Sequence, residues 1–129
     1  MAGFSDYLED AVLNHVFAGS AYTAPSTLYL ALYTVAPTDT GGGTEVSGGS
    51  YARLAATFTV SGTDPTTATN AVAEFATATG SWGTVTSTGV FDALTSGNLL
   101  AYADLTTDKT VGSGDVFRFD AGDLDITLV

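Results

Sequence analysis

The N-terminal residues carry a helical pattern of apolar positions. Ser5 has the side chain of a helix cap, and Asp6 and Glu9 place negative charge in the first turn, where the helix dipole favours it. Gly19 can adopt the left-handed conformation that ends a helix. This pattern predicts one short amphipathic helix near residues 5–17. Its apolar face recurs at i, i+3, i+4, i+7 and i+8: Leu8, Ala11, Val12, His15 and Val16.

Beyond Pro25 the apolar positions alternate with a period of two, which is typical of strands. Turn-forming residues separate the alternating segments. The pattern predicts a mainly β fold, an antiparallel β-sandwich or barrel of about seven strands with one short N-terminal helix. The predicted strands are 28–33, 52–60, 71–76, 83–91, 98–105, 115–119 and 124–129.

With 129 residues, the chain is expected to form a single domain over residues 1–129. Two of its connections are unusually long for a domain of this size. Residues 36–50 contain five glycines and join two predicted strands, so we expect a long loop that is either a contact surface or disordered. The segment from Ser61 to Asn70 is rich in threonine and contains Pro65, which argues against a central strand there.

Charge and composition exclude several classes of function. The chain has 14 acidic and 3 basic residues, a net charge of −11, so it repels phosphate backbones and anionic membrane faces. It has no cysteine, its apolar runs are too short to span a bilayer, and its first residues lack the layout of a secretory signal. We therefore expect no nucleic-acid binding and no membrane insertion, and synthesis in a cytoplasm.

Candidate catalytic chemistry is sparse. His15 is the only histidine and lies on the apolar face of the predicted helix, so packing or an interface is its expected role. No serine lies in a Gly-x-Ser-x-Gly elbow, and Gly41-Gly42-Gly43 lacks the Lys-Ser or Lys-Thr of a phosphate loop. We expect a protein that is not an enzyme and has no cofactor.

An acidic cluster near the C-terminus is a weak candidate for binding calcium. Asp120, Asp123 and Asp125 can converge around the turn at Ala121 and Gly122, and hard cations prefer carboxylate oxygens. The spacing does not match the twelve-residue calcium loop, so a solvated acidic hairpin is the expected alternative.

Aromatic side chains offer a third route to function. Flat amphipathic rings serve both sugar stacking and subunit interfaces, although core packing accounts for most of them. Trp82 lies between Gly80-Ser81 and Gly83, which suits packing under a loop. The candidates are Tyr22, Tyr29, Tyr33, Tyr51, Trp82 and Tyr102.

Several motifs together resemble a family of small tailed-bacteriophage proteins commonly labelled phage tail fibre protein. The run from Gly41 to Arg53 is the most specific of them, and the resemblance covers nearly the whole chain. Ser87-Thr88 departs from the aromatic or histidine-containing residues expected before Gly89-Val90-Phe91. The further matching segments are 3–9, 14–17, 29–34 with 36–37, 82–86, 89–93, 97–100 and 122–128.

This resemblance implies a structural role in the virion, as an accessory tail or fibre-type component assembled on the particle surface. Capsid decoration and a glycan-binding adhesion module that recognises host glycans are the alternatives. The expected partners are other virion proteins of the tail, neck or capsid, and further copies of the chain, a trimer being one form. The interface candidates are His15, Phe17, Glu45, Val46, Tyr51, Arg53 and Trp82.

Overall fold

The computed structural model describes residues 3–60 and 67–127. These residues form one helix and eleven strands, so the predicted mainly β fold is confirmed. Chain order runs β1 (Gly3–Phe4), α1 (Asp6–Phe17), β2 (Leu28–Val35), β3 (Thr44–Glu45), β4 (Leu54–Ala56), β5 (Phe58–Val60), β6 (Thr67–Asn70), β7 (Ala73–Glu74), β8 (Gly83–Phe91), β9 (Leu99–Val111), β10 (Arg118–Phe119) and β11 (Asp125–Thr127).

The three longest strands form the centre of a six-stranded antiparallel sheet. Its order is β1-β9-β8-β2-β3, and β4 also pairs with β2. The period-two pattern of β2 decides which side chains face the two sides of this sheet. Leu30 and Leu32 join the main core on one face, while Ala31 and Tyr33 join a smaller cluster on the other.

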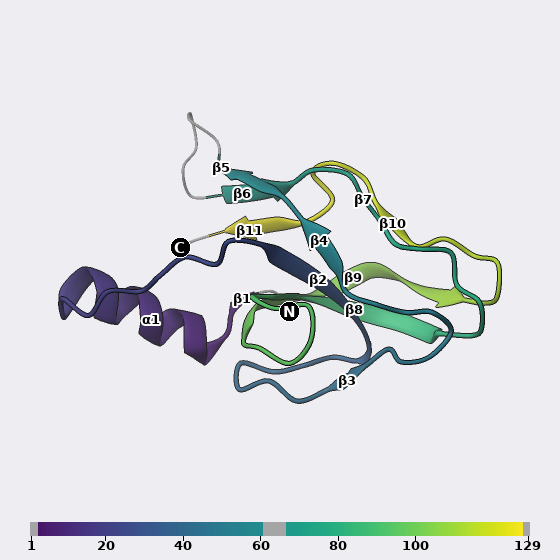
Figure 1. Ribbon diagram of the computed structural model, residues 1–129, viewed down its shortest axis with the longest axis horizontal. Coiled ribbons are helices and arrows are strands. Elements are labelled where there is room, and N and C mark those ends of the chain that lie inside the picture. Colours follow the sequence, from purple (N-terminus) through teal and green to yellow (C-terminus); the bar gives the residue numbers. More distant parts are fainter. Residues whose placement is uncertain (1–2, 61–66, 128–129) are drawn as a thin grey trace.

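Two smaller sheets cover the main core. One has the order β11-β6-β5, and the other pairs β10 with β7, both antiparallel (Figure 1). Phe75, Phe117 and Phe119 contribute aromatic rings from this layer to the core beneath the six-stranded sheet. Their rings meet edge to face, with centroids 5.9 Å apart for Phe75 and Phe117 and 5.0 Å apart for Phe117 and Phe119. The sheets therefore form two layers over one core, as in a sandwich.

Strand boundaries differ from the predicted ones where tertiary pairing intervenes. The segment 83–91 is a strand as predicted, but the predicted strand 98–105 continues to Val111. The register shifts within this extension, because β9 advances five residues from Asp104 to Lys109 while the antiparallel β8 spans two, from Ser87 to Val85. The predicted strand 52–60 divides into β4, which pairs with β2, and β5, which pairs with β6. The strand count is therefore higher than the predicted seven.

The expectation that the segment from Ser61 to Asn70 avoids a central strand is wrong. Residues 67–70 form β6, the middle strand of the three-stranded sheet. Pro65 removes only its own donor, so the chain is free to pair from Thr67 onward. Residues 61–66 of this connection, and the last two residues of the strand predicted over 124–129, lie outside the described residues.

The glycine-rich loop folds back on β2. Gly41, Gly42 and Gly43 all have positive φ angles, of 98°, 77° and 73°. A Cβ atom at Gly43 would lie 2.6 Å from the carbonyl oxygen of Val35, so this position requires glycine for space as well as for conformation. The glycine run is a turn that returns the chain to pair as β3 beside β2.

The predicted helix is present as α1, and its N-cap is Ser5, whose hydroxyl accepts from the Leu8 N–H at 3.2 Å. The Ser5 N–H in turn donates to the Leu100 carbonyl of β9 at 2.8 Å, which anchors the start of the helix. No residue of α1 is buried, and the helix extends away from the sheet layers (Figure 1). Its predicted apolar face is therefore only half covered.

Candidate functional site

The predicted interface residues separate into two places. His15 and Phe17 lie on α1. The others gather in or beside the glycine-rich loop, where they contact one another or the core: Glu45, Val46, Tyr51, Arg53 and Trp82. Their role at an interface stays a prediction.

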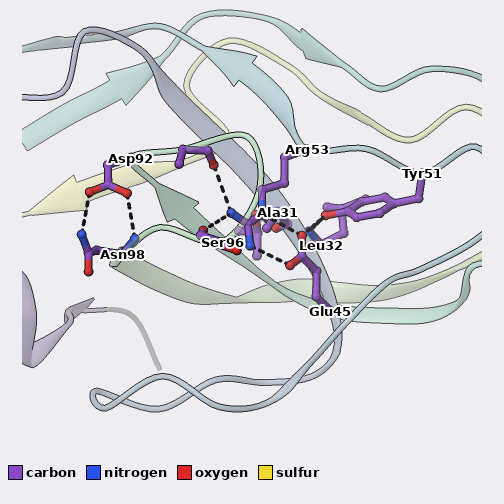
Figure 2. A network of polar contacts seen from close by, with 10 residues as sticks. Ala31, Leu32, Glu45, Tyr51, Arg53, Asp92, Ser96 and Asn98 are labelled. Atoms are coloured by element: carbon purple, nitrogen blue, oxygen red, sulfur yellow. Dashed lines mark hydrogen bonds and ion pairs between the residues drawn. The ribbon is translucent and has the colours of Figure 1, made fainter.

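Glu45 and Arg53 form an ion pair with two parallel hydrogen bonds. Arg53 Nη2 lies 2.9 Å from Glu45 Oε1, and Arg53 Nε lies 2.9 Å from Glu45 Oε2 (Figure 2). The two side chains are 9% and 25% exposed, so water screens the pair only in part. This bidentate geometry is the strong form of an arginine–carboxylate contact.

The remaining donors of Arg53 reach a second loop. Its Nη1 donates to the carbonyl oxygens of Ala93 at 3.0 Å and Ser96 at 2.7 Å. The guanidinium carbon lies 3.6 Å from the centre of the Phe91 ring, a cation–π contact. Arg53 therefore joins the loop 36–50 to the loop 92–98. We call Glu45, Tyr51, Arg53 and these loop carbonyls the Glu45–Arg53 network.

Tyr51 connects this network to the central sheet. Its hydroxyl donates to Glu45 Oε2 at 2.7 Å and accepts from the Leu32 N–H of β2 at 3.0 Å. Burial, and then the hydrogen bond to the Glu45 carboxylate, raise the pKa of Tyr51 well above its usual value. The hydroxyl is therefore a permanent donor at physiological pH.

Val46 and Trp82 are packed inside the chain. Val46 is 5% exposed, and its N–H donates to the Leu32 carbonyl at 2.9 Å. Trp82 is 4% exposed, and its indole N–H donates to the Gly49 carbonyl at 3.0 Å. The Trp82 ring meets Tyr51 edge to face at 5.4 Å. Trp82 therefore packs under a loop, as its sequence context indicated. Sugar stacking requires an exposed ring face, and this ring is covered.

His15 holds the chain that returns from the helix. Ser20 N–H donates to the Asn14 carbonyl at 3.0 Å, after Gly19 turns with a φ of 70°, as predicted for the end of the helix. The Tyr22 N–H then donates to His15 Nδ1 at 3.0 Å, and the Tyr22 ring meets Tyr7 edge to face at 6.5 Å. Together α1 and residues 18–27 form what we call the N-terminal arm.

The end of this arm exposes large apolar side chains. Phe17 is 81% exposed, Val16 60% and Leu13 56%. These residues stand at i, i+3 and i+4, so they share one face of the last turn. Sequence reasoning placed Phe17 among the interface candidates but missed Leu13, although this spacing was the signal that could have found it.

A tyrosine–carboxylate pair lies at the base of the arm. The Tyr102 hydroxyl of β9 donates to Asp39 Oδ1, and the Asp39 carbonyl accepts from the Asp6 N–H at 2.9 Å. The hydrogen bond to Asp39, burial and the nearby charges of Asp6 and Glu9 raise the pKa of Tyr102 to about 12. This pair ties the glycine-rich loop to the start of α1.

The calcium candidates lie along the rim of a groove of about 790 Å³ between β9 and the segment that carries β10 and β11. Arg118 Nε donates to Asp120 Oδ1 at 2.8 Å, and Asp123 Oδ2 accepts from the Asp120 N–H at 2.8 Å. Asp120 and Asp123 therefore serve a salt bridge and a turn. Within residues 3–60 and 67–127, no three histidine, cysteine or acidic side chains gather so that they could hold a metal ion, Asp125 included.

In the part of the chain that the structure describes, no helix is long and apolar enough to cross a membrane.

Comparison with curated proteins finds no match for this chain. A family model does match, and it covers residues 3–127, which include both the Glu45–Arg53 network and the N-terminal arm. The family is one of phage structural fibre proteins. The chain belongs to this family, which is described as Podophage GP4 fiber I protein gp80.

Proposed function

We propose that this chain is a non-enzymatic fibre component that assembles on the surface of a tailed phage particle, at its tail or neck. The observation that carries the proposal is the extent of the family match, because residues 3–127 include every described element. The fibre role then applies to the whole β-sandwich and the arm, and not to a short shared segment.

The geometry of the described residues supports a role as a structural component of a larger assembly. The sheets share one core, and the Glu45–Arg53 network joins two surface loops to each other and to the central sheet. Such a body presents a rigid surface, whereas the N-terminal arm extends from it (Figure 1). The apolar side chains at the end of this arm are exposed. We propose that the arm contacts other virion proteins. Copies of the chain also associate with one another, with a trimer as one form.

Gold-labelled antibodies against the purified protein, applied to intact particles, test this proposal. We expect signal confined to the tail or neck, and loss of that signal from particles made without the gene. Signal spread over the head would overturn the placement and favour the capsid-decoration alternative. Absence of signal from every part of the particle would overturn the virion role altogether.

Recognition of host glycans stays an alternative outcome. Trp82, one of the aromatic candidates for sugar stacking, lies under the 36–50 loop and gives this alternative no support. Binding of the purified protein to a glycan array would favour the adhesion module over a purely structural role, and an array without a hit would count against the adhesion module.

A further inference from the structure

The outward side of α1 carries two kinds of residue in one stripe. All of its members are exposed, and their spacing of three and four places them along one line of the helix. The first half of the stripe is acidic and the second half is apolar: Asp6, Glu9, Asp10, Leu13, Val16 and Phe17.

The other side of α1 already has a partner. Leu8, Ala11 and Val12 are half-buried, and the helix contacts β1 and β9 of the six-stranded sheet. The stripe therefore points away from the body of the protein that the structure describes. Because Phe17 is 81% exposed, its ring gains little burial energy within the described residues, and burial of apolar side chains is what stabilises a fold.

Exposed apolar residues at helical spacing beside charged ones are typical of a helix that binds in a groove. Such helices insert anchors at i, i+3 and i+4 into an apolar groove, and charges at the rim decide the partner. Leu13, Val16 and Phe17 match these anchors. The acidic first half of the stripe is complementary to a rim of lysine or arginine.

A second copy of this chain does not offer that rim. Its three basic residues are Arg53, Lys109 and Arg118. Arg53 is paired with Glu45 inside the network, and Arg118 is paired with Glu74 and Asp120. Lys109 is exposed and, with Arg118, lines the groove of about 790 Å³ beside β9. The other charged residues that line this groove are acidic, so it does not complement an acidic stripe: Asp104, Asp120, Asp123 and Asp125. Each copy has a net charge of −11, and the acidic half of the stripe adds to the repulsion between copies, so their association uses another surface of the chain. Charge complementarity therefore points to a different protein.

We propose that the stripe from Asp6 to Phe17 docks the fibre in an apolar groove with a basic rim on a different virion protein. This inference rests on the proposed function, because it requires the chain to be on the particle. It adds the attachment surface and the chemistry of its partner.

Reloading of particles tests the proposal. Particles produced without the gene are mixed with purified protein, and the bound protein is quantified after sedimentation of the particles. Loss of a central aromatic anchor costs at least about tenfold in affinity, so we expect Phe17→Asp and Val16→Asp to weaken loading by about tenfold or more. The matched control is Val60→Asp in β5, because Val60 is 58% exposed and Val16 is 60% exposed.

Salt and charge variants test the acidic half. We expect loading to weaken as salt rises, because added ions screen the acidic residues from the basic rim. A Glu9→Gln and Asp10→Asn double variant keeps Ser5 and Asp6 at the helix start, and its loading should depend less on salt. Loading of this double variant with an unchanged salt dependence would contradict the charge complementarity.

Cross-linking identifies the occupant of the stripe. A photoreactive amino acid at position 17, activated on loaded particles, should attach to a virion protein other than this chain. Attachment to a second copy would overturn the proposal and assign the stripe to self-association. The proposal would also be overturned if sedimentation of the purified Phe17→Asp variant gave a smaller assembly mass than the wild type, because Phe17 would then lie between copies of the chain.

The outcomes separate the two proposals. Equal loading of wild type, Phe17→Asp and Val60→Asp overturns the docking stripe and leaves the fibre role standing. Failure of the wild type to load, together with absence of the protein from native particles, overturns the fibre role and the inference with it. Circular dichroism of each variant is the check that the helix is retained.

Discussion

The Glu45–Arg53 network and the N-terminal arm use their side chains in opposite ways. In the network, a charged arginine is 9% exposed at its side chain, and its donors meet a carboxylate and two carbonyl oxygens. At the end of the arm, an apolar phenylalanine is 81% exposed and has no such cover. A buried charge whose hydrogen-bond partners lie in the same chain indicates an internal contact. An exposed apolar cluster indicates a contact that another molecule completes.

Removal of Arg53 should have the largest effect on this comparison. Arg53→Ala leaves the Glu45 carboxylate without its ion-pair partner, and the carbonyls of Ala93 and Ser96 without this donor. We expect the free energy of unfolding to fall by about 3 kcal/mol, measured by chemical denaturation. Arg118→Ala is the control, because its ion pairs are exposed, and its denaturation midpoint should not move measurably. Equal effects of the two variants would contradict the distinction.

Gly49 tests how tightly the loop packs on Trp82. A Cβ atom there would lie 2.9 Å from the Trp82 indole nitrogen and 2.9 Å from the Gly80 carbonyl oxygen. We expect Gly49→Ala to lower the free energy of unfolding by about 2 kcal/mol, from backbone strain together with this clash. Gly48→Ala has a similar positive φ angle but nothing within 4 Å, so it isolates the strain and should cost about half as much. Thermal unfolding of both variants provides the measurement.

The base of the arm should be sensitive to alkaline pH. The pKa of Tyr102 is raised to about 12 in the folded protein, against 10.0 when unperturbed, so the protonated hydroxyl favours the folded state. This contribution to stability is fully present below pH 10.0 and is lost as the pH rises through about 12. Denaturation midpoints measured across this range should fall less steeply for Tyr102→Phe than for the wild type. Parallel curves would show that another group is responsible.

Ser87 should give a smaller effect of opposite sign. Its hydroxyl oxygen is fully buried in β8 and has no hydrogen-bond partner among the described residues, whereas the neighbouring Thr88 hydroxyl donates to the Ala31 carbonyl at 2.7 Å. Removing an unsatisfied buried hydroxyl stabilises a protein, so we expect Ser87→Ala to raise the free energy of unfolding by about 1 kcal/mol. The control Thr88→Val removes a satisfied hydroxyl and should destabilise. A destabilising Ser87→Ala would mean that the hydroxyl has a partner in solution.

The smallest effect on stability should come from the arm itself. Because Phe17 is 81% exposed, Phe17→Ser should change the free energy of unfolding by less than about 0.5 kcal/mol. Phe75→Ala is the comparison, since Phe75 is 2% exposed in the core and its truncation should cost about 3–5 kcal/mol. A large loss from Phe17→Ser would indicate that the ring packs against the body in solution.

Local patterns predicted the elements that depend on neighbouring residues. Ser5 caps α1, Gly19 turns the chain after it, and the alternation over 83–91 became β8. The patterns failed where pairing partners lie far apart. Residues 67–70 became a central strand because β5 and β11 lie on either side of them, although Pro65 precedes them.

The sequence pointed to the residues of the Glu45–Arg53 network but not to the contacts between them. The run from Gly41 to Arg53 stood out in the sequence, but nothing local shows that Arg53 donates to the carbonyls of Ala93 and Ser96, forty or more positions away. Nor does spacing show that Trp82 packs beneath Gly49. These contacts depend on which strands become neighbours.

The sequence by itself determined the mainly β fold, the capped helix, the acidic character and the resemblance to phage fibre proteins, because each follows from composition or from residues close together in the chain. The tertiary structure alone decided which side chains have partners within the chain and which are exposed. Arg53 and Phe17 were equal candidates in the sequence. Burial separates them, since exposure depends on the packing of distant strands around each side chain and not on the identity of its neighbours in the chain.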